Sequence, residues 1–359
     1  MEKATVMGYV REQPTRLKYV FENREEFIKP FREVFEKKNI KKVIFLGSGT
    51  SYNAGVIACY YFKQIVGIDA QVFFPTIYTN YEIADWSHSL KKDEILFVGI
   101  SQSGTSISTI NAIKKAHEEG YFTLVFTGNL ESEITKYADV KTHELVGPEL
   151  TPPETKGYTV TLISLYLFAI NAANVKGTLS NSDFLKAEDE LKDLVNNFQT
   201  VIDESESWYE KNKTTIVNSD RIYCLGYGVD FGSCYEAQLK IGEMLRVPSI
   251  IYEMEEYTHG PTMAITNKMT ILMVGSDDCE YERLKFFNKT FKKYNPRVHV
   301  ITCKDFDGDE RDCLFSVKAN KYIAPLMYAV PFQFVAAQGA ADIGIDTSID
   351  PFEEKLAHL

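Results

Sequence analysis

The sequence predicts an α/β protein made of two tandem, doubly wound parallel-sheet domains. Apolar runs typical of strands alternate with amphipathic helical segments, which is the pattern of parallel βαβ units. The order of segments in the first half then restarts in the second half, as expected of a duplicated unit. The chain has 359 residues, enough for two domains, and its hydrophobic content of 45% is that of a globular protein.

The first half has the clearer strand and helix signals. A charged segment over residues 12–38 has helical periodicity and precedes the first strand. We expect strands over residues 43–47, 70–74, 95–100 and 122–127, and helices over 51–66 and 104–119. An apolar helix near 156–173 is shorter than the roughly 20 apolar residues that cross a bilayer, so we expect it in the core. A polar helix over about 182–213 follows as a bridge.

The second half repeats the first at two anchor points. Arg221–Gly228 matches Lys42–Gly49, with an offset of 179 positions, and Met269–Gly275 matches Asp93–Gly99, with an offset of 176. We therefore expect a helical lead-in over residues 1–27, a first domain over 28–180, a linking helix over 181–213, a second domain over 214–345 and a tail over 346–359.

Two glycine- and hydroxyl-rich loops follow consecutive strands of the first domain. They are Gly47-Ser-Gly-Thr-Ser-Tyr-Asn-Ala-Gly55 and Ser101-Gln-Ser-Gly-Thr-Ser106, and each opens a helix. Backbone N–H groups at such a helix start, with the helix dipole behind them, bind anions and above all phosphate. The alternative is that Ser101–Ser106 only caps its helix, although a cap needs one hydroxyl and this loop offers four. We expect a phosphorylated small molecule in the crevice of the sheet.

The second copy has diverged at the corresponding loop. After Gly275 it carries Ser276-Asp-Asp-Cys-Glu-Tyr-Glu282, whose carboxylates would repel a phosphate. Only the first copy is therefore expected to hold the anion.

The helix after Gly228 in the second copy carries Glu236, Lys240 and Glu243 on one helical stripe. One interpretation is a solvent-facing ladder of charges. The other is a proton-transfer group, because the start of this helix faces the ligand crevice in a doubly wound fold. His259 stands before Gly260-Pro261 in a turn, and imidazole is well suited to moving protons near neutral pH.

Composition and charge exclude several classes of function. The formal net charge is −11 and no cluster of Lys and Arg occurs, so we expect no nucleic-acid partner. The six cysteines show no metal-ligand spacing, and we expect neither a metal ion nor a cofactor. The N-terminus lacks the apolar core of a signal peptide, so we expect a cytoplasmic protein without a membrane partner.

These motifs together resemble the SIS (sugar isomerase) phosphosugar-binding family, whose domains are flavodoxin-like. The likeness is to the isomerase half of glutamine–fructose-6-phosphate aminotransferase and to stand-alone deglycases of fructosamine 6-phosphates. It covers nearly the whole chain and rests on the following segments: Glu12-Gln-Pro14, Gly49-Thr-Ser-Tyr-Asn53, Ser101-Gln-Ser-Gly104, Thr155-Lys156, Glu236-x-x-x-Lys240-x-x-Glu243, His259-Gly-Pro261 and the Val-Pro-Phe-Gln run at Pro331.

The resemblance implies roles for these residues. The sugar phosphate would be held by the matches of Ser101, Gln102, Ser103 and Ser106, with Thr50 and Ser51 at the sugar. Glu243 would move a proton between C1 and C2, beside Lys240 and Glu236. His259 would open the sugar ring from the neighbouring subunit, which implies a homodimer with shared sites. Lys355 is the candidate for an imine-forming lysine, although its spacing from Pro351 differs from the family pattern.

Two departures from the family pattern bear on the reaction. The glutaminase domain with its terminal cysteine is missing and residue 2 is Glu, so we expect no ammonia release from glutamine. Glu154 stands where the synthase-like pattern has a small hydroxyl residue before Thr155-Lys156. Its carboxylate could pair with an amine of the substrate, or it could equally favour the dipole of the following helix.

The sequence therefore predicts an enzyme that acts on an amino sugar 6-phosphate or a sugar–amino-acid adduct, releasing a hexose 6-phosphate and a free amine. The first alternative is an aldose–ketose isomerase, or glucosamine-6-phosphate deaminase or synthase-like chemistry without a glutaminase domain. The second alternative is a non-catalytic sugar-phosphate sensor, which would not need Glu243 and His259 together.

Overall fold

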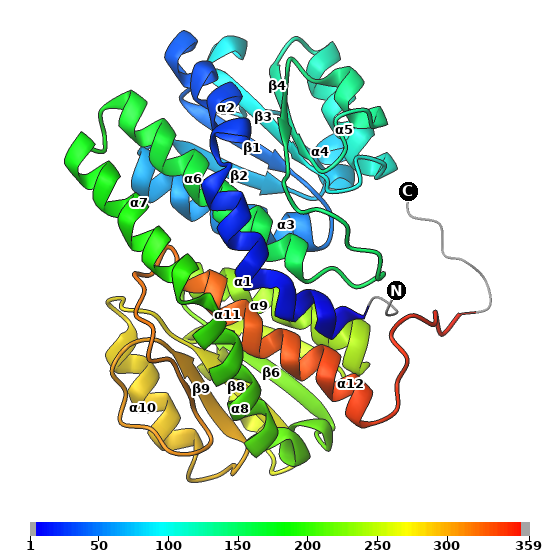
Figure 1. Cartoon of the computed structure of the whole chain (residues 1–359), viewed down its shortest axis with the longest axis vertical. Coiled ribbons are helices and arrows are strands. Elements are labelled where there is room, and N and C mark those ends of the chain that lie inside the picture. Colours follow the sequence, from blue (N-terminus) through cyan, green and yellow to red (C-terminus); the bar gives the residue numbers. More distant parts are fainter. Residues whose placement is uncertain (1–4, 353–359) are drawn as a thin grey trace. The chain divides into compact units, whose positions relative to one another are not determined.

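The computed structural model describes residues 5–352 and contains two five-stranded, fully parallel sheets with helices on both faces (Figure 1). The chain forms two compact units that are not continuous in sequence. The first-sheet unit comprises residues 16–149, 157–190 and 352, and the second-sheet unit comprises residues 5–15, 150–156 and 191–351. The predicted class, α/β with two tandem doubly wound sheets, is confirmed.

The first sheet has the strand order β2-β1-β3-β4-β5. Its strands are β1 (Lys42–Leu46), β2 (Asp69–Phe73), β3 (Ile95–Ile100), β4 (Phe122–Thr127) and β5 (Val140–His143). One face is covered by α4 (Pro75–Tyr81) and α5 (Ile107–Glu118), which pack on an apolar cluster of the strands. The other face is covered by α2 (Glu25–Lys37), α3 (Thr50–Tyr61) and α6 (Lys156–Lys176). Phenylalanine rings of α2 and α6 meet there with Phe62, the residue that follows α3.

Helix α6 is the apolar helix expected in the core. It has 21 residues and is long and apolar enough to cross a membrane, so the argument that it is too short is wrong. However, 89% of its most apolar window is buried inside the protein, and Phe168 stacks on Phe31 with ring centroids 4.2 Å apart. Its burial, and not its length, identifies α6 as a core helix.

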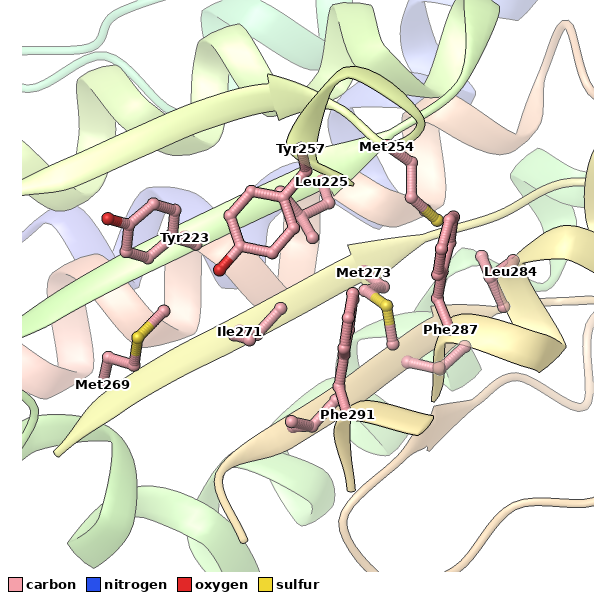
Figure 2. Packing of buried hydrophobic residues seen from close by; sticks show 12 residues of the cluster. Tyr223, Leu225, Met254, Tyr257, Met269, Ile271, Met273, Leu284, Phe287 and Phe291 are labelled. Carbon is pink, nitrogen blue, oxygen red and sulfur yellow. The ribbon is translucent and has the colours of Figure 1, made fainter. Parts of the chain in front are cut away.

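The second sheet has the equivalent strand order, β7-β6-β8-β9-β10. Its strands are β6 (Arg221–Gly226), β7 (Ser249–Glu253), β8 (Met269–Val274), β9 (Val298–Thr302) and β10 (Cys313–Leu314). Helix α10 (Tyr281–Phe291) packs on one face, where Phe287 and Phe291 lie over Ile271 and Met273 (Figure 2). Helices α8 (Phe198–Val217), α9 (Gly228–Lys240), α11 (Ala324–Gln333) and α12 (Gly339–Asp342) also belong to this unit.

The duplication extends to an unusual local feature. A π-helical turn follows each first crossover helix, η1 (Phe62–Val66) after α3 and η4 (Ile241–Leu245) after α9, at the predicted offset of 179. Both turns end on a residue with positive φ, Gly67 at 74° and Arg246 at 58°. The first anchor of the repeat is therefore correct.

The second anchor of the repeat is wrong by two residues. Leu46 pairs with Gly99 in the first sheet, and its match Leu225 pairs with Met273 in the second. Gly275 therefore corresponds to Ser101 and not to Gly99, and the offset between the copies is 174 at this point. The first residues of α5 and α10 are separated by the same offset. A slip of two residues keeps every side chain on its face of the sheet, so the apolar pattern could not reveal it.

Two segments expected to be single helices are each divided. The segment over 12–38 forms α1 (Val6–Glu22) and α2, and the segment over 182–213 forms α7 (Asn181–Asn196) and α8 (Phe198–Val217). An asparagine lies at each break, Asn23 and Asn197, and its side-chain amide donates to the carbonyl four residues earlier. Such local bonds compete with helix continuation.

Candidate functional site

The first part of the candidate site is the loop Ser101–Ser106, which joins β3 to α5. Gly104 has a φ of 68°, and its N–H donates to the carbonyl oxygen (3.1 Å) and the hydroxyl oxygen (3.2 Å) of Ser101. A Cβ at position 104 would overlap a neighbouring side chain, so only glycine fits this turn. The carbonyl of Gln102 accepts a 2.9 Å hydrogen bond from the N–H of Gly128, which ties the loop to the end of β4.

The hydroxyl groups of this loop do not cap α5. Ser106 is the N-cap residue, but among residues 5–352 its side chain makes no capping hydrogen bond. Ser103 and Thr105 are exposed and share a 2.9 Å hydrogen bond. The capping alternative is therefore not supported. The hydroxyls lie instead at the positive end of the helix dipole, where an anion is stabilised.

Thr50 and Ser51 begin α3 at the same edge of the sheet. Leu46 pairs with Gly99, so β1 and β3 are neighbours and their carboxyl ends lie side by side. Thr50 is buried, whereas Ser51 is partly exposed. The structure thus brings together the two loops that the sequence predicted to form an anion site.

The second part is a charged cluster at the end of α9. Glu236 and Lys240 are each 2% exposed. The Lys240 ammonium lies 3.8 Å from the Glu236 carboxylate and 2.9 Å from that of Glu243. Glu243 is on the π-helical turn η4, its side chain is 36% exposed, and it lines an open hollow of about 500 Å³. The interpretation as a solvent-facing ladder is therefore wrong, because two of its three members are buried.

The charge on Lys240 is stabilised by glutamates from two parts of the chain. Burial by itself lowers the pKa of this ammonium, but three carboxylates outweigh burial and raise the pKa above its usual value. These carboxylates belong to Glu236, Glu243 and Glu154.

The position of this cluster corrects one expectation. Lys240 is the last of the 13 residues of α9, roughly 18 Å along the helix from Gly228. The start of α9 lies at the carboxyl edge of its own sheet and the charged residues lie towards the other end. They do not face the crevice at the edge of the second sheet, as the sequence argument assumed.

Sequence reasoning gave no role to four further residues that surround Glu154 and Thr155. The ammonium of Lys156, fully buried, lies 3.2 Å from the carboxylate of Glu12. The buried amide of Gln13 donates to that of Gln333 (2.7 Å), which in turn donates to the carbonyl of Thr155 (3.0 Å). The family-like segments at Glu12, Thr155 and Pro331 were the available signal, but nothing in the sequence showed that they meet.

Helix α6 begins beside this segment and has its own carboxylate partner. Glu149 accepts a 2.8 Å hydrogen bond from the N–H of Gly157 in the first turn of α6. Glu154 adds to the negative potential at Lys240. The charge of Glu154 therefore acts on the Lys240 cluster, and its pairing with a substrate amine stays a prediction.

His259 lies on a turn between two short 3₁₀ segments, η5 (Glu256–Thr258) and η6 (Pro261–Ala264), and is exposed. Tyr257 anchors this turn, since its ring is fully buried and packs against Tyr223 and Phe291 (Figure 2). The imidazole is therefore held at the surface of the unit. Lys355, the candidate for an imine-forming lysine, lies outside the described residues.

Comparison with known proteins agrees with the duplicated fold. The family model described as the SIS domain matches residues 38–171 and 215–341. A glutamine–fructose-6-phosphate aminotransferase (isomerizing) from Caldanaerobacter subterraneus subsp. tengcongensis is 26% identical over 348 residues, covering 94% of this chain and 56% of the relative. The chain thus spans about half the length of the curated relatives it matches.

Solved structures show the same fold. A proposed phosphosugar isomerase from Clostridium difficile has a TM-score of 0.86 and 28% identity, covering 98% of this chain and 97% of the other. The C-terminal domain of glucosamine-fructose-6-phosphate aminotransferase from Francisella tularensis has a TM-score of 0.83 at 21% identity, covering 97% and 98%. At that identity the second likeness supports the fold alone.

Proposed function

Because the chain belongs to the SIS domain family, we propose that it is an enzyme that breaks the C–N bond of an amino sugar 6-phosphate or a sugar–amino-acid adduct. Its products would be a hexose 6-phosphate and a free amine. The observation that carries the proposal is the environment of Glu243, a partly exposed carboxylate paired with a buried ammonium. Such a group can take up and return a proton while its partner stays charged.

In the proposed reaction the loop Ser101–Ser106, with Thr50 and Ser51, holds the phosphate group. The sugar ring opens with help from His259. Glu243 then moves a proton from C1 of the open-chain ketoamine to C2, while the amine nitrogen loses a proton and O2 gains one, which gives an imine at C1. Water adds to this imine and the amine leaves, so that one water is consumed for each C–N bond broken.

The carboxylates of Glu236, Glu243 and Glu154 raise the pKa of the buried Lys240 ammonium. C–N cleavage and aldose–ketose isomerisation both move a proton between C1 and C2, so both would use Glu243 in the same way. C–N cleavage is placed first because of the resemblance to deglycases of fructosamine 6-phosphates, and turnover of the three substrates tests that order. A cytoplasmic homodimer, with His259 supplied by the partner subunit, is part of the same proposal.

The test is turnover of three substrates by the purified protein: a fructosamine 6-phosphate, glucosamine 6-phosphate and fructose 6-phosphate. We expect the fructosamine 6-phosphate to release amine and hexose 6-phosphate in equal amounts. Glu243→Gln should lower kcat by about 10²-fold or more, because it removes the proton-transfer group. The exposed Glu282→Gln on α10 is the matched control and should retain wild-type activity.

The substrate series also separates the alternatives. Turnover of fructose 6-phosphate alone would favour an isomerase, and turnover of glucosamine 6-phosphate alone would favour a deaminase. If a phosphosugar binds tightly but none is converted, and Glu243→Gln changes nothing, the enzyme proposal fails and a sensor is favoured.

A further inference from the structure

A buried carboxylate lies where the second sheet would be expected to bind an anion. Asp230 is the third residue of α9 and is 4% exposed. One carboxylate oxygen accepts the N–H of Ser276 at 2.7 Å and the other accepts the hydroxyl of Ser276 at 2.8 Å. Ser276 is 2% exposed and follows the end of β8, so helix start and loop are joined through this carboxylate.

The duplication identifies the residue of the first copy that is equivalent to Asp230. Asp230 corresponds to Ser51 at the offset of 179. The close approach before it is also repeated: a Cβ on Gly226 would come 2.8 Å from the backbone of Asp230, and a Cβ on Gly47 would come 2.9 Å from Ser51. Helix start and strand end therefore have the same relation in both copies. At this position the second copy has a buried carboxylate, whereas the first copy has the partly exposed hydroxyl of Ser51.

The loop after β8 has kept its length while its chemistry has changed. With the structural offset of 174, Gly275–Glu280 corresponds to Ser101–Ser106 without an insertion. Asp277 and Glu280 thus stand where the first copy has Ser103 and Ser106. Two of the loop's acidic side chains are paired with lysines, Asp277 with Lys304 and Asp278 with Lys321. The backbone of an anion loop remains, but its hydroxyl donors have been replaced by acidic groups.

The groups facing Asp230 come from several elements. Tyr328 on α11 lies 3.4 Å from the hydroxyl oxygen of Ser276 and contacts Cys303 at 3.3 Å. Burial raises the pKa of Asp230 to about 7, the two hydrogen bonds from Ser276 oppose this, and of the nearby charges Asp278 raises the pKa while Lys321 lowers it. At about pH 8 the carboxyl group is therefore ionised.

We propose that the carboxylate of Asp230 is the built-in occupant of the anion position of the second sheet. The duplicated chain then has one position for an external phosphate, in the first sheet. The second position has become a structural anchor that fastens the loop after β8 to the start of α9.

The test restores the second loop and counts bound phosphate. The parent variant carries Asp277→Ser, Asp278→Gly and Glu280→Ser, which copy the residues of the first loop. The test variant adds Asp230→Ser, which copies Ser51. Inorganic phosphate bound per chain is measured by equilibrium dialysis at about pH 8. We expect one more phosphate per chain in the test variant than in the parent.

Two results of the dialysis would overturn the proposal: an extra phosphate already present in the parent, or no difference between the parent and the test variant. The measured quantity is the difference in bound phosphate between two variants with the same first loop, so the test remains valid even if the wild-type protein binds no phosphate. Absence of phosphate binding by the wild type would contradict the proposed function and not this proposal. If the test variant does not fold, the infrared difference between wild type and Asp230→Asn at about pH 8 decides. A carboxylate band is expected, and a protonated carboxyl band would overturn the proposal.

Discussion

Glu144 is another buried carboxyl group, placed just after β5 in the first-sheet unit. It is 1% exposed, accepts a 2.5 Å hydrogen bond from the hydroxyl of Thr161, and its other oxygen has no hydrogen-bond partner among the described residues. Burial raises the pKa of Glu144 to about 8, so the group carries a proton at neutral pH. A protonated carboxyl is the form that this apolar position tolerates.

This raised pKa predicts a stability that falls with rising pH. The unfolded chain releases the Glu144 proton near its usual pKa of 4.5, whereas the folded chain keeps it up to about 8. Folding free energy is therefore lost between these values, and the loss is complete above about pH 8. Glu144→Gln should stabilise the protein by a few kcal/mol at about pH 9 and have little effect at about pH 4.

Urea unfolding of wild type and Glu144→Gln at several pH values measures this difference. The exposed Glu131→Gln, on the turn after β4, is the control and should follow the wild type. A stability gain for Glu144→Gln that does not change with pH would show that Glu144 is not the titrating group.

At the level of residues, the sequence predicted which charged side chains share one helix face, but it did not predict what surrounds them. The spacing of Glu236, Lys240 and Glu243 predicts one helical stripe, and the structure has it. Their burial depends on segments distant in the chain, including the one that carries Glu154, and no local pattern encodes that meeting. Asp230 went unnoticed for the same reason, because its partner Ser276 belongs to another element.

At the level of elements, strands were more predictable than helix ends. Buried parallel strands such as β3 are continuous apolar runs, which are visible in any sequence. The helix break at Asn197 rests on one side-chain hydrogen bond, and the π-helical turn η4 leaves no compositional trace. The short helix α4 and the strand β5 were not predicted, since each is too short to show a period.

Arg246 ends the π-helical turn η4 in a conformation that favours glycine. Its φ is 58°, and the matching residue in the first copy is Gly67. The guanidinium donates to the carbonyls of Ile349 (2.7 Å) and Asp346 (3.5 Å), so the strained residue fastens the C-terminal segment of the second-sheet unit. Backbone strain and side-chain anchoring thus act at one position with opposite effects on stability.

Two substitutions separate these effects. Arg246→Ala and Arg246→Gly both remove the guanidinium, but only glycine relieves the left-handed strain, so Arg246→Gly should be the more stable by about 1 kcal/mol. Both should speed proteolysis of the segment around residues 346–351 equally, as followed by mass spectrometry. Equal stability of the two variants would mean that position 246 is not left-handed in solution.

At the level of the whole molecule, duplication has produced two units with different chemistry. The first-sheet unit keeps a hydroxyl-rich loop at the end of β3, and the second-sheet unit has the charged cluster at Lys240 and an acidic loop after β8. The net charge of −11 makes the whole chain unfavourable to anions, so the proposed phosphate binding would depend on local donors in the first loop. After duplication, the loop of the second copy could become acidic while the first copy kept its hydroxyl-rich loop.

The exposed position of His259 leads to a prediction about the assembled enzyme. Suppose that His259 of one subunit acts in the same site as Glu243 of its partner. A dimer of one Glu243→Gln chain and one His259→Ala chain then contains one site in which both residues are intact. Each variant alone should be inactive, while a reassembled equal mixture should recover about a quarter of wild-type activity, because half of the dimers are hybrids with one intact site.

A mixture of Glu243→Gln with Lys240→Met is the control. It should stay inactive, because both changes lie in one cluster and no hybrid site is intact. Recovery confined to the first mixture requires a site shared between subunits, and no recovery in either would mean that each chain uses its own His259.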